Sequence, residues 1–82
     1  MHHVEIFTLI YNEVMISYEP LWKTMKEKNV SQYKLLKSGI DTKTLDSLRK
    51  NKNINTVTIE KLCNIIGCTP SDILEFITED KK

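Results

Sequence analysis

Residues 31–50 read SQYKLLKSGIDTKTLDSLRK, and this stretch decides the fold because it predicts two short helices joined by a tight turn. Ser31 fits the N-cap of the first helix, since its hydroxyl can accept a free backbone N–H of the first turn. Gly39 can take the positive φ that ends a helix. Asp41 then caps a second helix over about residues 42–50.

The second of these helices has a narrow apolar edge. Only Leu45 and Leu48 lie on its inward side, and its other side chains are polar, small or basic. Such a helix is usually a solvated surface helix, yet a helix that reads a DNA groove must have the same pattern. Two short helices joined by a Gly-containing turn, the second of them polar and basic, meet the physical requirements of a helix-turn-helix.

Three further helices are predicted, one before this pair and two after it. Pro20 suits the first turn of the earliest helix, and Gly67 ends the fourth. The run from Thr69 to Asp72 fits a helix start and leads into an apolar fifth helix. The sequence therefore predicts an all-α domain of five helices, with the polar residues 51–55 as a loop. The first expected helix covers about residues 19–28, the second runs from its cap Ser31 to Ser38, and the third covers about residues 42–50. The fourth starts at Thr56 or Thr58 and ends at Gly67, and the short fifth follows its cap Thr69 and extends to about Ile77.

The first sixteen residues do not fit this helical scheme. Val4, Ile6 and Phe7 favour a strand, yet Phe7, Ile10 and Val14 also match helical spacing. A strand here would need a partner, and the simplest is the same strand of a second copy. A flexible leader is the other interpretation. The expected division is 1–16 as an N-terminal extension and dimerisation strand, 17–77 as the helix-turn-helix domain, and 78–82 as a C-terminal tail.

The charges are unevenly distributed along the chain. The formal net charge is +1, but residues 31–55 carry six basic side chains against two acidic ones, a local net charge of +4. Residues 1–30 and 56–82 are mildly acidic, at −1 and −2. A basic centre between acidic ends is the pattern that a localised phosphate-binding surface leaves in a sequence.

Composition bounds the class of protein. Eighty-two residues make one small domain, whose limited core favours a homodimer. Cys63 and Cys68 come with no secretory signal and no metal-type cluster, so we expect reduced, core-facing thiols in a cytoplasmic protein. Trp22 and Tyr33 are expected to be core aromatic residues. No stretch approaches the roughly 18 apolar residues of a membrane helix, so no membrane partner is expected.

Several segments carry a resemblance to a known family, namely SQYKLL at 31–36, GID at 39–41, TL at 44–45, TIEKLC at 58–63 and CTPSDILE at 68–75. Through them the chain resembles the Cro and phage-repressor-like (XRE-type) helix-turn-helix family, and in particular the small stand-alone transcriptional regulators of Firmicutes. The resemblance covers about residues 17–77. It implies five helices, DNA binding by the second and third, and a role as a transcriptional regulator of a bacterium, phage or mobile element.

The chain departs from the family pattern in three places. The turn between the second and third helices is about one residue shorter, Leu36 stands where a small Ala is common, and Asn51 stands where Gly is common. These departures concern how the third helix is aimed at a groove and leave the predicted fold unchanged.

Side-chain chemistry divides the helix-turn-helix into two sets of DNA-contacting residues. Lys43 can donate to guanine, and it lies near a helix N-terminus, where stability alone would favour an acid. Asp46 either accepts from a cytosine amino group or pairs with Lys50 one turn on. Gln32 can present its amide and the helix N-terminus to a phosphate. The expected base-reading residues are Thr42, Lys43, Asp46 and Ser47. The expected phosphate-binding residues are Gln32, Thr44, Arg49, Lys50, Asn51, Lys52 and Asn53.

An enzyme is disfavoured by what the sequence lacks. It contains no Gly-rich phosphate loop, no triad pattern, no metal signature and no histidine inside the domain, so no cofactor or metal is expected. The alternative is a helix-turn-helix fold reused for protein interaction, as in an antirepressor or antitoxin. The basic centre favours double-stranded DNA. We therefore expect a sequence-specific transcriptional regulator, a repressor, that binds as a homodimer and takes no small-molecule ligand.

Overall fold

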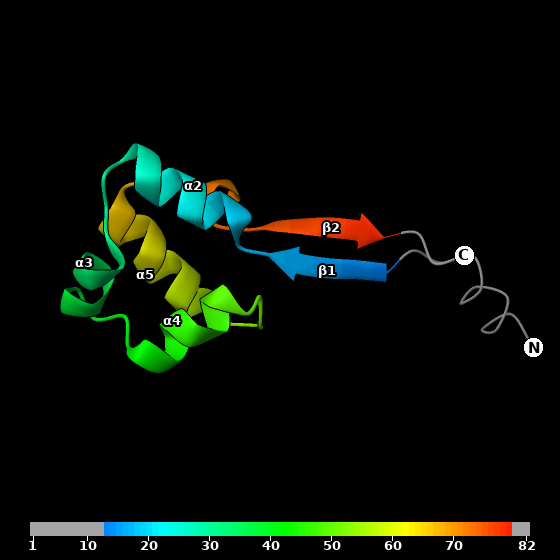
Figure 1. Cartoon of the computed structure of the whole chain (residues 1–82), viewed down its shortest axis with the longest axis horizontal. Coiled ribbons are helices and arrows are strands. Elements are labelled where there is room, and N and C mark those ends of the chain that lie inside the picture. Colours follow the sequence, from blue (N-terminus) through cyan, green and yellow to red (C-terminus); the bar gives the residue numbers. More distant parts are fainter. Residues whose placement is uncertain (1–12, 80–82) are drawn as a thin grey trace, which may run out of the picture.

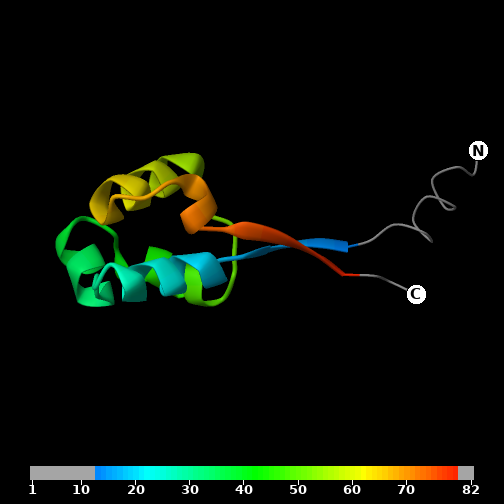
Figure 2. The same ribbon diagram turned by 90° about the horizontal axis from the view of Figure 1, so that it is seen from above.

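The computed structural model describes residues 13–79, which form four α-helices and a two-stranded antiparallel sheet (Figure 1). The helices gather at one end, and the two strands leave them side by side as a ribbon (Figures 1 and 2). None of these helices is long and apolar enough to cross a membrane. The elements are, in chain order, β1 (Glu13–Ser17), α2 (Glu19–Glu27), α3 (Gln32–Lys37), α4 (Thr42–Arg49), α5 (Thr56–Ile66), the 3-10 turn η1 (Pro70–Asp72) and β2 (Glu75–Glu79).

The prediction of an all-α domain with five helices is wrong at the last helix. Residues 70–77 form only the single turn η1 before the chain enters β2, which pairs antiparallel with β1. Phe76 and Ile77 are an aromatic and a β-branched residue, which favour strands. A helix this short gains few hydrogen bonds against its nucleation cost, whereas the ladder with β1 pairs five residues of each strand.

The N-terminal strand has its partner within the same chain. In β1, Met15 lies opposite Ile77 and Ile16 lies opposite Phe76, so one edge of this strand needs no second copy. Residues 1–12 of the expected extension lie outside the described residues, as do residues 80–82 of the expected tail. The dimer itself stays a prediction.

Tyr18 joins the ribbon to the helices. Its side chain is fully buried, and its hydroxyl donates to the backbone carbonyl of Lys52 at 2.7 Å. The Tyr18 backbone N–H donates to Oδ1 of Asn51 at 3.0 Å. Because buried polar groups need partners, these bonds hold the loop after α4 against the start of α2. The buried apolar core consists of Tyr18, Leu21, Met25, Leu35, Ile40, Leu45, Leu48, Leu62, Ile66 and Ile73.

Two of the aromatic residues expected in the core lie in different environments. Trp22 is half-buried and packs against the core. Tyr33 is 67% exposed on α3, so its assignment to the core is wrong. The reason is geometric, since α3 is a helix of six residues and only Leu35 on it is buried.

Candidate nucleic-acid interface

The helices α3 and α4 begin at the caps expected from the sequence. The Ser31 hydroxyl accepts the Lys34 N–H at 3.0 Å, and an Asp41 carboxylate oxygen accepts the Thr44 N–H at 2.8 Å. Between them, Gly39 has a φ of +108°, a conformation that side-chain-bearing residues rarely adopt. These local bonds set where α4 starts.

The core residues of α4 and its expected base-reading residues point in different directions. Leu45 and Leu48 are buried beneath the helix, as predicted. Thr42 and Lys43 are exposed, while Asp46 and Ser47 are half-buried. Residues four apart share a helix face, so Thr42 lies above Asp46 and Lys43 above Ser47. The four expected base-reading residues therefore form one neighbouring group on α4.

A hydrogen bond joins the two ends of the helix pair. Nη2 of Arg49, in the last turn of α4, donates to Oε1 of Gln32, in the first turn of α3, at 2.6 Å. These two expected phosphate-binding residues are 17 positions apart in the sequence. The contact places the Arg49 guanidinium beside the N-terminus of α3, where backbone N–H groups attract anions.

Asp46 pairs with Lys50, one of the two alternatives that the sequence left open. Nζ of Lys50 lies 3.2 Å from a carboxylate oxygen of Asp46. Both side chains are at least half exposed, so the pair contributes little to stability. Its main effect is on charge, because it offsets the acid that α4 would otherwise present to DNA.

The loop after α4 carries three expected phosphate-binding residues in unlike roles. Asn51 has a φ of +55°, and its side-chain carbonyl already accepts the Tyr18 N–H. The Lys52 carbonyl accepts the Tyr18 hydroxyl, while the Lys52 and Asn53 side chains are exposed. Asn51 therefore orients the loop, a role that its residue type alone did not reveal.

Two lysines outside the expected set also lie beside the helix pair. Nζ of Lys61, from α5, is 3.5 Å from the Gly39 carbonyl at the turn. Nζ of Lys37 lies 5.7 Å from the centroid of the exposed Tyr33 ring, within range of a cation–π contact. Lys61 could not be found by spacing, because only the packing of α5 brings it to the turn.

The cap residue Asp41 is held in its charged form. Bonds from the side chain and backbone of Thr44 lower the pKa of Asp41 below its ordinary value, with smaller contributions from Lys43 and Lys61. A carboxylate at a helix N-terminus is also favoured by the helix dipole. The start of α4 thus carries one fixed negative charge among basic neighbours.

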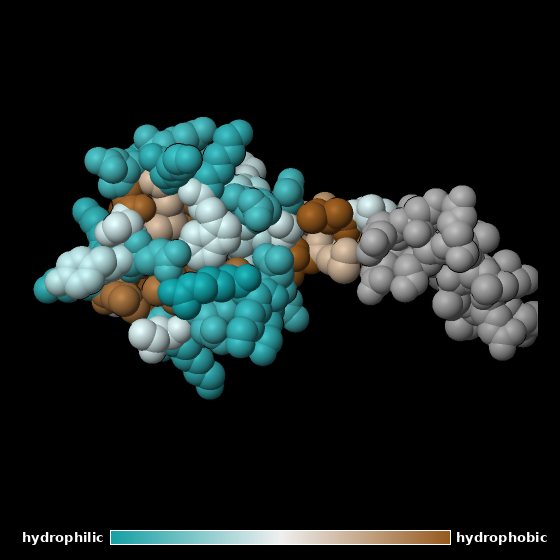
Figure 3. All heavy atoms as spheres, in the orientation of Figure 1, coloured by the Kyte–Doolittle hydropathy of each residue, from teal (hydrophilic) through white to brown (hydrophobic). Residues whose placement is uncertain are grey.

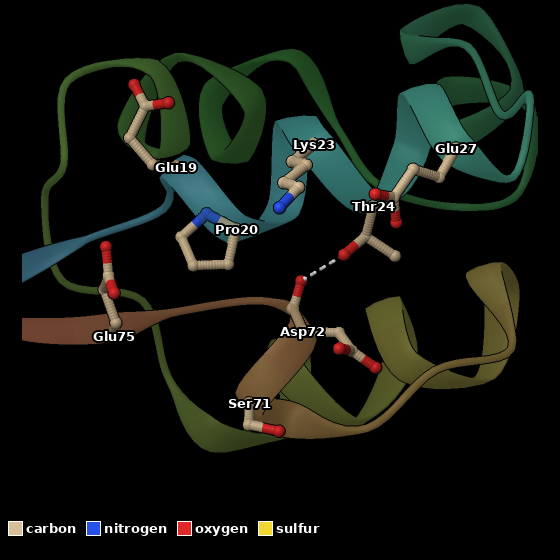
Figure 4. Close-up of a pocket in the computed structure, with 8 residues that line it drawn as sticks. All are labelled: Glu19, Pro20, Lys23, Thr24, Glu27, Ser71, Asp72 and Glu75. Carbon is tan, nitrogen blue, oxygen red and sulfur yellow. Dashed lines mark hydrogen bonds between the residues drawn. The ribbon is translucent and has the colours of Figure 1, made fainter.

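An acidic cleft lies on a different part of the domain. It has a volume of about 410 Å³ and is lined from α2, η1 and β2 (Figure 4). There the Thr24 hydroxyl donates to the Asp72 carbonyl at 2.9 Å. Four carboxylates and one lysine line it, which disfavours contact with DNA phosphates. The lining residues are Glu19, Pro20, Lys23, Thr24, Glu27, Ser71, Asp72 and Glu75.

The two cysteines lie together at the end of α5. The Cys68 N–H donates to the Cys63 carbonyl at 3.1 Å, around Gly67 with a φ of +80°. Both residues are half-buried, and each thiol influences the pKa of the other. Burial raises the pKa of Cys63, and burial and neighbouring negative charge raise that of Cys68 to about 11. In residues 13–79 no group of three His, Cys, Asp or Glu side chains could hold a metal ion.

Comparisons with known proteins agree with this geometry. Residues 20–79 match the Cro/C1-type HTH DNA-binding domain. Among solved structures, the chain is similar to a crystal structure of the transcriptional regulator VanUg, with a TM-score of 0.74 and 27% sequence identity, over 80% of this chain and 89% of that one. No curated protein matches the chain.

Proposed function

The chain belongs to the family of Cro/C1-type helix-turn-helix DNA-binding domains, and from that premise we propose that it represses transcription by binding a specific double-stranded DNA sequence. The DNA-binding regulator class follows from the family. We further propose that the protein binds DNA sequence-specifically as a homodimer, acts as a repressor in the cytoplasm, and takes no cofactor or small-molecule ligand.

One observation carries this proposal. The polar face of α4, with Thr42 and Lys43 exposed, ends at an arginine hydrogen-bonded to the start of α3. The joined helices α3 and α4 therefore offer donors for base edges along α4 and a cationic side chain, Arg49, beside the N-terminus of α3. Phosphate contacts set register, and base contacts specify sequence, so a DNA reader needs both in a fixed relation.

The proposed roles follow the geometry. Lys43 and Thr42 enter the major groove first, since they stand at the exposed start of α4. Ser47 reads the next base pairs, and Asp46 either accepts from cytosine or keeps its pair with Lys50. Gln32 and Arg49 hold one phosphate together. The side chains of Thr44, Lys50, Lys52 and Asn53 hold others, and Asn51 serves mainly by shaping their loop.

Selection of bound duplexes from a random pool tests this function. The full chain should enrich one sequence motif, and Lys43→Ala should change that motif at the positions Lys43 contacts. Lys52→Ala should keep the motif and weaken binding to all duplexes. Lys23→Ala, in the acidic cleft, is the matched control and should change neither. Enrichment of no motif would reject the proposal in favour of a protein-interaction module.

The repressor role needs its own measurement. The selected motif should be placed over a promoter in front of a reporter gene, and expression of the full chain should lower reporter output. The same promoter with a scrambled motif is the control. Raised output from the motif-bearing promoter would make the protein an activator instead.

A further inference from the structure

A lysine from α5 stands over the turn between α3 and α4. Nζ of Lys61, in the second turn of α5, lies 3.5 Å from the Gly39 carbonyl oxygen. This carbonyl follows the end of α3 at Lys37 and precedes the start of α4 at Thr42, and no backbone N–H within residues 13–79 donates to it. The ammonium group of Lys61 is therefore the partner that the packing of α5 supplies to this carbonyl.

The same ammonium group also acts on the cap that starts α4. A β-carbon placed on Gly39 would lie 3.9 Å from Nζ of Lys61, so the lysine side chain rests against the backbone of the turn. The pKa of Asp41, whose carboxylate caps α4, is lowered mainly by its hydrogen bonds with Thr44, and the positive charge of Lys61 adds to this lowering. The charge of Lys61 therefore acts both on the backbone at Gly39 and on the cap at Asp41.

The attraction between Lys61 and the turn is mostly electrostatic. A separation of 3.5 Å is long for an N–H···O hydrogen bond, whose usual range is about 2.7–3.2 Å. The carbonyl oxygen and the Asp41 carboxylate are both negative, so one ammonium group attracts both. The Lys61 side chain is exposed, and the surface over α4 is largely hydrophilic in the space-filling view (Figure 3). Water therefore screens the attraction, and we expect it to affect the position of the turn more than the stability of the domain.

With this contact, α4 is held to the rest of the domain at both of its ends. The last turn of α4 is tied to α3 by the Arg49–Gln32 hydrogen bond. At the start of α4, the hydrogen bond of the cap is local, since it joins residues three positions apart. Lys61 is 22 positions from Gly39 in the sequence, so it supplies at the start of α4 the kind of long-range tether that Arg49 supplies at its end.

We propose that Lys61 is a positioning residue for DNA recognition, which holds the turn at Gly39 and thereby sets the angle at which α4 presents Thr42 and Lys43 to the bases. This rests on the proposed function, in which those two side chains read bases. Lys61 itself has no contact with DNA in this scheme. Groups that recognise a ligand must be held within about 0.5 Å of their productive positions, so a small shift of the turn weakens base contacts and leaves phosphate contacts elsewhere intact.

Binding to two duplexes separates the aim of α4 from general attraction to DNA. Lys61→Met keeps a side chain of similar length and removes its charge. It should lower affinity for a duplex with the selected motif about fivefold and leave affinity for an unrelated duplex within about twofold. Lys61→Arg keeps the charge and should restore the wild-type ratio of the two affinities. Lys52→Ala is the contrasting control, because it should weaken both duplexes alike.

Salt dependence separates a positioning residue from a phosphate contact. If Lys61 bound a phosphate, Lys61→Met would make the slope of log affinity against log salt less steep by about 0.9. We expect the slope on both duplexes to stay as in the wild type. Equal weakening of both duplexes with a shallower slope would make Lys61 a phosphate-binding residue and overturn the proposal. An unchanged ratio of the two affinities in Lys61→Met would also overturn it.

Amide hydrogen exchange of the full chain tests the tether without DNA. The Ile40 and Thr44 N–H groups are hydrogen-bonded within the turn and the cap, so both exchange when this part of the chain opens. Lys61→Met should speed the exchange of these two amides about fivefold, and Lys61→Arg should restore the wild-type rates. The Lys34 N–H, bonded at the start of α3, is the internal control and should keep its rate. Equal acceleration of all three amides, or of none, overturns the proposal.

The outcomes keep this proposal distinct from the proposed function. A wild type that selects one motif, with an unchanged ratio of affinities in Lys61→Met, overturns the role of Lys61 and keeps the function. A wild type that selects no motif rejects the function, and with it the role of Lys61 in DNA recognition. The exchange rates then decide separately whether Lys61 holds the turn.

Discussion

The Arg49 guanidinium donates a hydrogen bond to the Gln32 side-chain carbonyl at 2.6 Å, and this bond ties the last turn of α4 to the first turn of α3. Neither helix could hold the other at this point by packing alone, because Arg49 is exposed and Gln32 only half-buried. The bond leaves further guanidinium N–H donors free, so the pair can bind an anion without breaking.

Removing either member of this pair should weaken DNA binding without changing sequence preference. Arg49→Ala and Gln32→Ala are each expected to lower affinity for specific and unrelated duplexes about tenfold. The double variant should lose less than the product of the two, because both side chains act on one phosphate. Fluorescence anisotropy of DNA binding by the wild type, both single variants and the double variant measures the coupling energy between Arg49 and Gln32. Fully multiplicative losses would show that the two residues act separately.

DNA affinity should fall steeply as salt rises. Each phosphate neutralised by the protein contributes about −0.9 to the slope of log affinity against log salt. Lys52→Ala should make this slope less steep by about one unit, since the Lys52 side chain is exposed and forms no ion pair within residues 13–79. Lys23→Ala should leave the slope as it is. A slope near zero in the wild type would exclude phosphate contacts as the source of affinity.

Asn51 should be costly to replace because of its backbone as well as its side chain. In Asn51→Ala, an alanine must keep the φ of +55°, which is unfavourable for a residue with a β-carbon. The variant also loses the side-chain acceptor for the Tyr18 N–H. Together these two effects should destabilise the fold by about 2 kcal/mol. Asn51→Gly also deletes this acceptor but avoids the steric cost of the positive φ, so it should cost only about 1 kcal/mol. Urea unfolding measures both. Equal losses in the two variants would show that φ contributes nothing.

Asp41 should make stability sensitive to acid. Its folded-state pKa lies below the ordinary value of 3.8, so the cap bond is fully present above that value. Its contribution is lost as pH falls through the lowered folded-state pKa. Asp41→Asn keeps a cap acceptor that does not titrate. Below about pH 4, wild-type stability should therefore fall more steeply than that of the variant in urea unfolding followed by circular dichroism. Parallel curves would contradict this.

The cysteine thiols should react slowly while the protein is folded. A thiol with a pKa of about 11, as for Cys68, has roughly one hundredth of the thiolate of an ordinary cysteine at neutral pH. Alkylation of Cys68 by iodoacetamide, followed by mass spectrometry, should be about 100-fold slower in buffer than in urea. The rate should rise steadily toward pH 10. Equal rates in buffer and urea would show that the thiol is not shielded.

Much of the helix-turn-helix could be predicted because its determinants are local. The caps at Ser31 and Asp41 and the positive φ of Gly39 involve residues within a few positions of each other. The inward positions of Leu45 and Leu48 follow from helical periodicity. These features are confirmed in the structure, and the surface location of the expected base-reading residues follows from them.

The amino-acid sequence by itself thus determined where α3 and α4 begin and which face of α4 is buried, because caps and periodicity act within one or two turns. Only the tertiary structure decided that residues 75–79 form a strand. The positions of Phe76 and Ile77 in the sequence fit a helix as well as a strand, and pairing with β1 selects the strand. The tertiary structure also turned Asn51 toward Tyr18 and Arg49 toward Gln32. Those contacts join residues 33 and 17 positions apart, and no local preference encodes such a distance.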